Sequence, residues 1–145
     1  MDAANALRGE VDLVLEGQSF VLRPSYTAII AMEQKTGLPL INLAQLAEQG
    51  ALTQEAQAIV VTELVRAWGR EAVLDEYAPA SEKAALASAK HANVDSIGLL
   101  LFDVGVLAVQ PRIQIVLGLA LTGGCLPSGE PKATGMMTTE IPVAD

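Results

Sequence analysis

The stretch from Ile97 to Thr122 constrains the fold most strongly, because it is almost continuously apolar. As one uninterrupted helix, it would be long enough to cross a bilayer. Pro111 argues against a single helix because proline has no backbone N–H, and Asp103 and Arg112 would each cost about 2.5 to 3.5 kcal/mol at the bilayer centre. We therefore expect no stable membrane span but a buried pair of helices, over residues 94–109 and from Pro111 onward. A membrane-associated segment is the weaker alternative.

The N-terminal part of the chain shows the two-residue alternation that is typical of β-strands. Apolar residues alternate on two arms around Glu16-Gly17, with Val11, Leu13 and Leu15 on the first arm and Phe20 and Leu22 on the second. This pattern predicts a β-hairpin over residues 8–23, although the loop Glu-Gly-Gln-Ser allows more than one register. Two strands alone are marginally stable, so the hairpin must pack on helices, join a third strand or pair with another subunit.

Three amphipathic helices are predicted between residues 25 and 69. Each begins at a capping residue or a proline and ends at a glycine, so the three segments run from Ser25 to Gly37, from Pro39 to Gly50 and from Thr53 to Gly69. Apolar residues recur at helical spacing within them. Each helix is therefore expected to bury one face.

A helical C-terminal half is predicted over residues 81–123. Residues 70–81 carry a proline and several charges without a sustained period, which indicates a linker or a short helical turn. Ser81 would cap an alanine-rich helix that ends at His91, and Asn93 would cap the first apolar helix. Gly123-Gly124 would end the last helix.

Together these elements predict a mainly α fold with a small N-terminal β-hairpin (α+β), in which about five helices pack as a single domain over residues 8–124. A chain of 145 residues suits one compact domain. Residues 1–7 are expected to form a flexible N-terminus. Residues 125–145 contain three prolines and no periodicity, which predicts a flexible tail.

The charge and composition argue against several kinds of partner. Nine Lys and Arg against 17 Asp and Glu give a net charge of −8, which is the wrong sign for binding a phosphate backbone, so nucleic acid is not expected as a partner. The single cysteine, Cys125, cannot form an internal disulfide, and residues 1–10 lack the features of a signal peptide. Both features favour an intracellular location.

The residues also predict no catalytic, cofactor or metal site, so we expect a protein that is not an enzyme. The one histidine, His91, falls at a helix end, where an exposed imidazolium is favourable. One His and one Cys cannot supply a four-ligand zinc site without carboxylates, and no Lys-Ser or Lys-Thr follows Gly123-Gly124 as in a phosphate-binding loop. Asp103 must face solvent, a polar partner such as Arg112, or an interface.

Binding to other proteins is therefore the expected activity, through apolar side chains of the hairpin and helices. The candidate protein-binding residues are Val11, Leu13, Leu15, Phe20, Leu22, Trp68, Leu100, Phe102 and Val106. The helical pair within Ile97 to Thr122 is expected to form either core or partner surface.

A longer motif runs from Arg8 to Gly37 and reads RGEV-x-L-x-L-x-G-x-x-F-x-LRPSY-x-AI-x-x-x-E-x-x-TG. This segment resembles tail proteins of the phage and gene transfer agent (GTA) family. The resemblance continues more loosely through Leu40 to Leu46, Gly50 to Thr53 and Ile59 to Trp68, and it covers roughly half of the chain.

The resemblance implies a phage-type tail-assembly protein. A chaperone that binds the tape-measure protein during tail morphogenesis is favoured over a structural tail-tube or tail-tip subunit, because a tube built as a β-barrel ring needs more strand residues. The implied partners are other tail proteins, namely the tape-measure, tail-tube or tail-tip proteins, and self-association into a homo-oligomer stays open. The implied location is the cytoplasm of a bacterial host or the virion tail.

Overall fold

The computed structural model describes residues 10–72, 74 and 76–123, so the predictions for residues 1–7 and 125–145 lie outside it. The described residues form a β-hairpin followed by six helices, which confirms the predicted mainly α fold with a small N-terminal hairpin. In chain order the elements are β1 (Val11–Leu15), β2 (Gln18–Leu22), α1 (Tyr26–Thr36), α2 (Leu40–Glu48), α3 (Gln54–Glu71), α4 (Ala80–Lys90), α5 (Val94–Val104) and α6 (Val106–Leu121).

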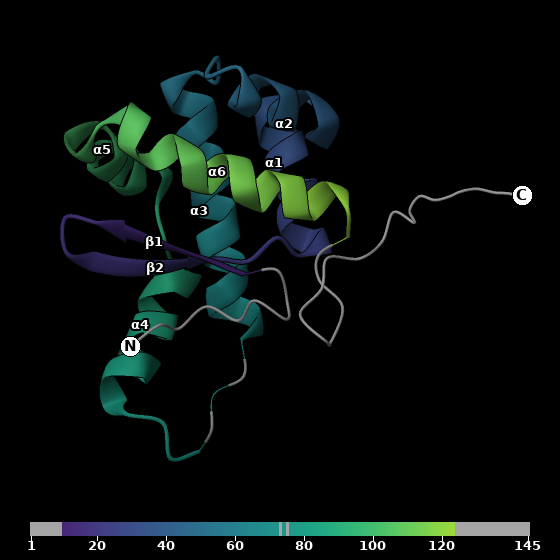
Figure 1. The fold of residues 1–145 in the computed structure, drawn as a ribbon. Coiled ribbons are helices and arrows are strands. Elements are labelled where there is room, and N and C mark those ends of the chain that lie inside the picture. The colour runs from purple at the N-terminus through teal and green to yellow at the C-terminus, as the bar shows by residue number, and fades with distance from the viewer. Residues whose placement is uncertain (1–9, 73, 75, 124–145) are drawn as a thin grey trace, which may run out of the picture.

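Helix α3 is the centre of the fold, and the other elements pack around it (Figure 1). Between Gln57 and Trp68 every residue of α3 except Arg66 is buried. A helix can be buried on nearly all sides only when neighbours cover each of its faces. Helices α1, α4 and α5 and strand β2 provide that cover, while α6 lies across α2 and β1.

The hairpin has a single register, which the sequence left open. Leu15 pairs with Gln18 across a two-residue turn, and Val11 pairs with Leu22 at the other end. Glu16 and Gly17 both have positive φ, at 50° and 77°, as a tight hairpin turn requires. Of the three ways to stabilise two strands, this chain uses helix packing: β2 contacts α3, and β1 contacts α5 and α6.

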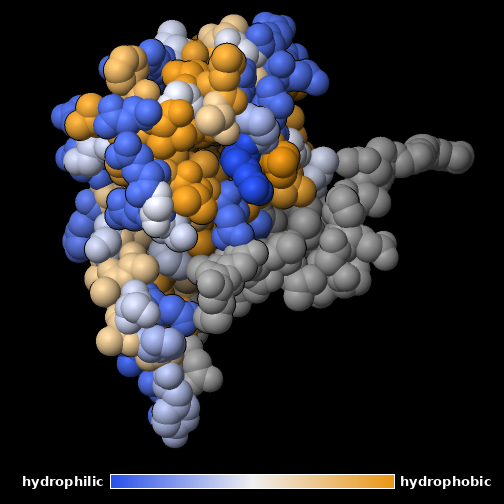
Figure 2. Space-filling view, turned by 60° about the vertical axis from the view of Figure 1, so that its left-hand side comes forward, coloured by the Kyte–Doolittle hydropathy of each residue, from blue (hydrophilic) through white to orange (hydrophobic). Residues whose placement is uncertain are grey.

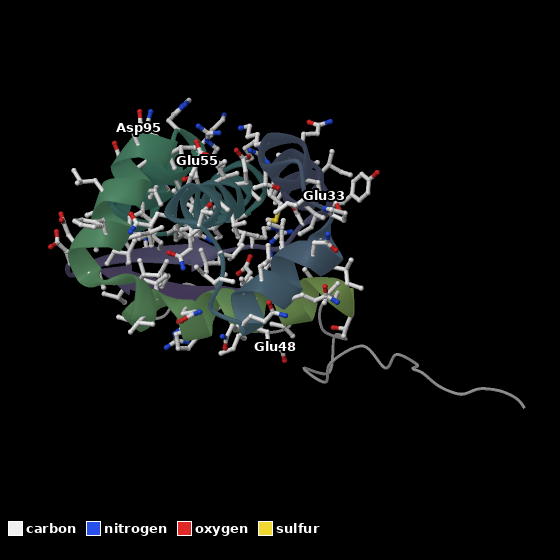
Figure 3. All side chains as sticks on the ribbon, turned by 90° about the horizontal axis from the view of Figure 1, so that it is seen from above. Glu33, Glu48, Glu55 and Asp95 are labelled. Carbon is white, nitrogen blue, oxygen red and sulfur yellow. The ribbon has the colours of Figure 1, made fainter. Side chains whose placement is uncertain are left out.

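Most predicted helix ends are correct. The side chains of Ser25, Thr53 and Asn93 accept hydrogen bonds from the backbone N–H groups of the first turns of α1, α3 and α5. Gly37 ends α1 in the left-handed conformation, with φ 74°. Helix α2 has no side-chain cap from Pro39, but the N–H of Leu40 donates to the Glu33 carboxylate of α1 at 2.8 Å (Figure 3).

The predicted start of α4 and the predicted end of α3 are wrong. Ser81 does not cap α4, because the helix already begins at Ala80, after Pro79. Pro79 takes the N-cap position, with φ −59° and ψ 151°, so the helix starts two residues earlier than a Ser81 cap would give. Gly69 does not end α3, which continues to Glu71; its missing side chain instead lets α3 approach the backbone of Lys90 in α4.

The apolar stretch forms two helices, but the break falls at Gly105 instead of Pro111. Gly105 has φ 105° and ψ 128°, a conformation that only glycine adopts readily, and α5 and α6 meet there at 119°. Pro111 lies inside α6. The carbonyl that it leaves without a helical donor belongs to Leu107, a residue that is 82% exposed, so water can reach it.

Candidate protein-binding surfaces

The structure divides the nine predicted binding residues into core and surface. Five of them are buried and belong to the core of this chain, namely Val11, Leu13, Leu15, Leu22 and Trp68. Phe20, Leu100 and Val106 are partly exposed, and Phe102 is 63% exposed. The last four side chains can contact a partner without any opening of the fold.

A hollow lies between the hairpin and α4, and we call it the β2–α4 groove. It consists of two adjoining cavities of about 560 and 640 Å³. Phe20, Trp68, Ser19, Ser81 and Ala85 line both cavities. Four of the predicted residues therefore come together at this groove from β1, β2, α3 and α5, although they are far apart in the sequence: Leu13, Phe20, Trp68 and Leu100.

The wall that α4 contributes to the groove is built from small side chains. Its lining residues on α4 include Ser81, Ala84, Ala85 and Ser88. Figure 1 shows α4 beside and below the hairpin. Because alanine and serine extend only a short distance from the helix, they leave the space open in front of Phe20 and Trp68. The groove is thus a consequence of the alanine-rich composition of α4.

A second apolar surface lies on the outer sides of the bent helix pair, and we call it the α5–α6 face. It comprises Leu99 and Phe102 of α5 and Leu107 and Ile115 of α6, each at least 50% exposed. The inner sides of the same helices bury residues such as Leu101 and Ile113 against the core. Figure 2 shows hydrophobic residues gathered on this side of the molecule, among hydrophilic ones. Exposed apolar patches of this kind mark interaction sites.

Sequence reasoning missed Leu99, Leu107 and Ile115, because it placed the helix break at Pro111 and expected the pair to be buried. A usable signal was present: Leu107 and Ile115 are eight residues apart, which is close to two helical turns. Asp103 is exposed beside Phe102, so of its three predicted environments it has the solvent-facing one.

A polar cluster joins the ends of the hairpin, the start of α1 and the end of α3. The Arg23 guanidinium contacts Glu10 at 2.8 Å and Glu71 at 3.0 Å, and the hydroxyls of Ser25 and Thr27 donate to Glu71 at 3.0 and 2.6 Å. Burial opposes ionisation of Glu71, but these hydrogen bonds and the Arg23 charge outweigh it and lower the pKa of the carboxyl. These contacts tie Arg23 to both Glu10 and Glu71, and Glu71 to the first turn of α1. The cluster therefore has a structural role: it fixes these segments relative to one another.

A second buried carboxylate, Glu63 of α3, is held in the same way. Its oxygen accepts from the Lys35 ammonium of α1 and, at 2.9 Å, from the Arg66 guanidinium. Arg66 also donates to the carbonyl of Ala92 at 2.7 Å, which ties α3 to the segment before α5. A buried charge costs little only when it is paired, and both partners of Glu63 are cations.

The other acidic side chains are dispersed. Glu48, Glu55 and Asp95 lie on three different helices and are exposed (Figure 3). Within residues 10–72, 74 and 76–123, no three His, Cys, Asp or Glu side chains gather closely enough to hold a metal ion. His91 is exposed at the end of α4, where the sequence placed it.

Across the part of the chain that the structure describes, no single helix is long and apolar enough to cross a membrane. Helices α5 and α6 pass this test only as a pair, across their 119° bend.

Comparisons with known proteins find no matching family model, no matching curated protein and no matching solved structure.

Proposed function

We propose that this protein is a phage-type tail-assembly protein, a chaperone that binds the tape-measure protein during tail morphogenesis. The observation that carries the proposal is the α5–α6 face, where four large apolar side chains stay exposed on helices whose inner sides form the core. The segment from Arg8 to Gly37 resembles phage and GTA tail proteins, and this resemblance supports tail assembly as the process in which the protein acts.

A helical partner fits this face. Leu107 and Ile115 lie about two turns apart on α6, so an amphipathic helix can place its own apolar residues, three or four positions apart, between them. Burial of apolar surface contributes about 25 cal/mol per Å² before the costs of association are subtracted. The net charge of −8 keeps a chain with such an exposed face soluble. In this role the protein acts in the cytoplasm of a bacterial host, before the tail is complete.

The test is co-expression with segments of a tape-measure protein, followed by size-exclusion chromatography and mass spectrometry of the complex. The native chain should form a complex, and Leu107→Arg should abolish it. The control is Tyr26→Ser, which removes a side chain that is also strongly exposed but lies on α1, away from the face. Complex formation by Leu107→Arg at native strength, or a chain that stays monomeric with every segment, would contradict the proposal.

Mass spectrometry of purified particles separates the chaperone from the alternative, a structural tail-tube or tail-tip subunit. A chaperone leaves the assembly, so it should be found at few copies or none. Many copies per particle would show a structural subunit instead.

A further inference from the structure

The indole N–H of Trp68 is a hydrogen-bond donor that no side chain or backbone group of the described residues accepts. Trp68 is only 6% exposed, and a buried tryptophan usually has a partner for this group. Among the described residues, the fully enclosed side-chain atoms without a partner are Gln57 Oε1 and Thr62 Oγ1. The indole nitrogen is therefore not fully enclosed. Because Trp68 lines both cavities of the β2–α4 groove, its N–H opens into that groove.

A second fixed donor lies at the α5 end of the groove. Asn93 lines the cavity of about 560 Å³, and its side-chain oxygen already accepts from the backbone N–H groups of Asp95 and Ser96, at 2.8 and 3.1 Å. The side-chain amide of Asn93 therefore presents its N–H groups to an occupant, and the indole of Trp68 can only donate. An occupant that carries many acceptors and few donors is complementary to both groups.

The same cavity favours an uncharged occupant. Among the described residues that line it there is no Asp, Glu, Lys or Arg, and the one titratable side chain is His91. Acidic residues line only the adjoining cavity of about 640 Å³. A charged group would lose hydration in the first cavity without gaining an ion pair.

The groove is elongated and has an aromatic base. Phe20 and Trp68 line both cavities, and Ile97 and Leu100 of α5 extend the apolar lining of the first one. A polyproline II segment is extended, and it has no internal hydrogen bonds, so its carbonyl groups remain available as acceptors. Its prolines have no backbone N–H to leave unpaired. Segments of this kind bind in aromatic-lined grooves.

An added β-strand fits less well, because α3 covers the outer edge of β2. Val21 is 2% exposed, and the N–H of Arg23 donates to the carbonyl of Leu64 in α3 at 3.1 Å. A polyproline II segment needs no such edge, since it takes its hydrogen bonds from side-chain donors.

We propose that the β2–α4 groove binds an uncharged, proline-rich segment of a partner protein in the polyproline II conformation. Carbonyl oxygens of the segment accept from the Trp68 indole and from the Asn93 amide, and its apolar side chains cover Phe20 and Leu100. The site is separate from the α5–α6 face, and the inference does not rest on the tail-assembly proposal.

Trp68 supplies the measurement, because the only tryptophan of the chain gives a single indole signal in a proton–nitrogen correlation spectrum. The isotope-labelled full chain is titrated with the peptide acetyl-Pro-Pro-Leu-Pro-Pro-Leu-Pro-Pro-amide, whose leucines lie on one edge of the three-residue turn. The matched peptide has alanine at every proline position, which restores the N–H groups and removes the conformational restriction. We expect a saturable downfield shift of the indole proton with the first peptide and at least tenfold weaker binding of the second.

Two substitutions on α4 test the location of the site. Ala85 lines both cavities, so Ala85→Leu extends a side chain into the groove. The matched control is Ala87→Leu, at a position of the same helix that is also exposed but lines neither cavity. We expect Ala85→Leu to weaken peptide binding at least tenfold and Ala87→Leu to bind as the native chain does.

Trp68→Phe tests the hydrogen bond, because it removes the donor and keeps an aromatic ring. Calorimetric titration should show binding about threefold to tenfold weaker than that of the native chain, as expected for one lost hydrogen bond. If Trp68→Phe does not fold, the two α4 variants decide the question without it.

The proposal is overturned if the indole signal of the native chain shows no saturable shift, or if the alanine peptide binds as tightly as the proline peptide. Equal binding by Ala85→Leu and Ala87→Leu also overturns it. A peptide that binds only after removal of residues 124–145 does so too, because the chain's own prolines would then occupy the groove.

Discussion

Gly69 of α3 lies directly against the backbone of Lys90 at the end of α4. A Cβ atom on Gly69 would be 2.2 Å from the backbone nitrogen of Lys90 and 2.6 Å from its Cα atom. Real Cβ contacts are never so short, so the two helices can meet here only because residue 69 has no side chain. This contact anchors the C-terminal end of α4, and α4 lines the β2–α4 groove from Ser81 to Ala89.

Gly69→Ala should therefore destabilise the protein by about 1 to 3 kcal/mol, as overpacking does when backbone has to move. The matched control is Gly118→Ala in α6, where nothing lies within 4 Å of the added Cβ. Alanine is the better helix former, so the control should stabilise by about 0.5 to 1 kcal/mol. Chemical denaturation of both variants measures the difference, and equal stabilities would show that α3 and α4 are not in contact at this point.

Glu71→Gln should lower stability by about 1 kcal/mol at neutral pH, because it removes the charge that Arg23, Ser25 and Thr27 hold in place. The pKa of Glu71 is lowered from its ordinary value of 4.5, so the carboxylate stabilises the fold fully above about pH 4.5. The contribution is lost as the pH falls through the folded-state pKa.

Denaturation of the native chain and of Glu71→Gln between pH 3 and 7 measures this effect. The two stabilities should converge at the acidic end. Glu48→Gln, at an exposed site on α2, should change stability little at any pH. If the difference in unfolding free energy between the native chain and Glu71→Gln grew as the pH fell, the stabilising role of the Glu71 carboxylate would be contradicted.

Gly105→Ala should cost about 1 to 3 kcal/mol, although a Cβ there would meet nothing within 4 Å. The cost arises from the backbone alone, because φ 105° with ψ 128° is a region that alanine avoids. Gly118→Ala again serves as the sterically unhindered control. Thermal unfolding with circular dichroism measures both, and a neutral Gly105→Ala would place the bend between α5 and α6 elsewhere.

Leu→Ala substitutions on the inner and outer sides of the α5–α6 pair should have very different effects on stability. Leu101 is 2% exposed, so Leu101→Ala should cost about 2 to 5 kcal/mol through lost burial and a cavity. Leu107 is 82% exposed, so Leu107→Ala should change stability by no more than about 0.5 kcal/mol. Urea denaturation compares them directly. A large loss for Leu107→Ala would mean that the α5–α6 face is covered in the isolated protein.

Local patterns in the sequence predicted the elements well. Alternating residues around Glu16-Gly17 indicated the hairpin, and Ser25, Thr53, Asn93 and Gly37 marked helix ends that the structure contains. These signals are reliable because each depends on groups only a few residues apart, such as a side-chain oxygen and the N–H three positions later. The alternation also predicted that Val11, Leu13 and Leu15 share one face, and that face is buried.

Long-range contacts decided the remaining features. The sequence predicted the helix break at Pro111, but with α5 packed on α3 and α6 packed on α2 the chain bends at Gly105 instead. Gly69 resembles a helix end in the sequence, yet its role depends on Lys90, which is distant in the chain.

By itself, then, the sequence determined which segments are helix or strand and that apolar side chains must be hidden, because both follow from local hydrogen bonding and hydrophobic periodicity. Only the tertiary structure decided which apolar residues stay outside. Trp68 and Leu22 became core, while Leu107 and Phe102 remained exposed. The physical reason is that burial depends on the neighbours that the whole fold brings to a side chain, and those neighbours come from distant parts of the chain.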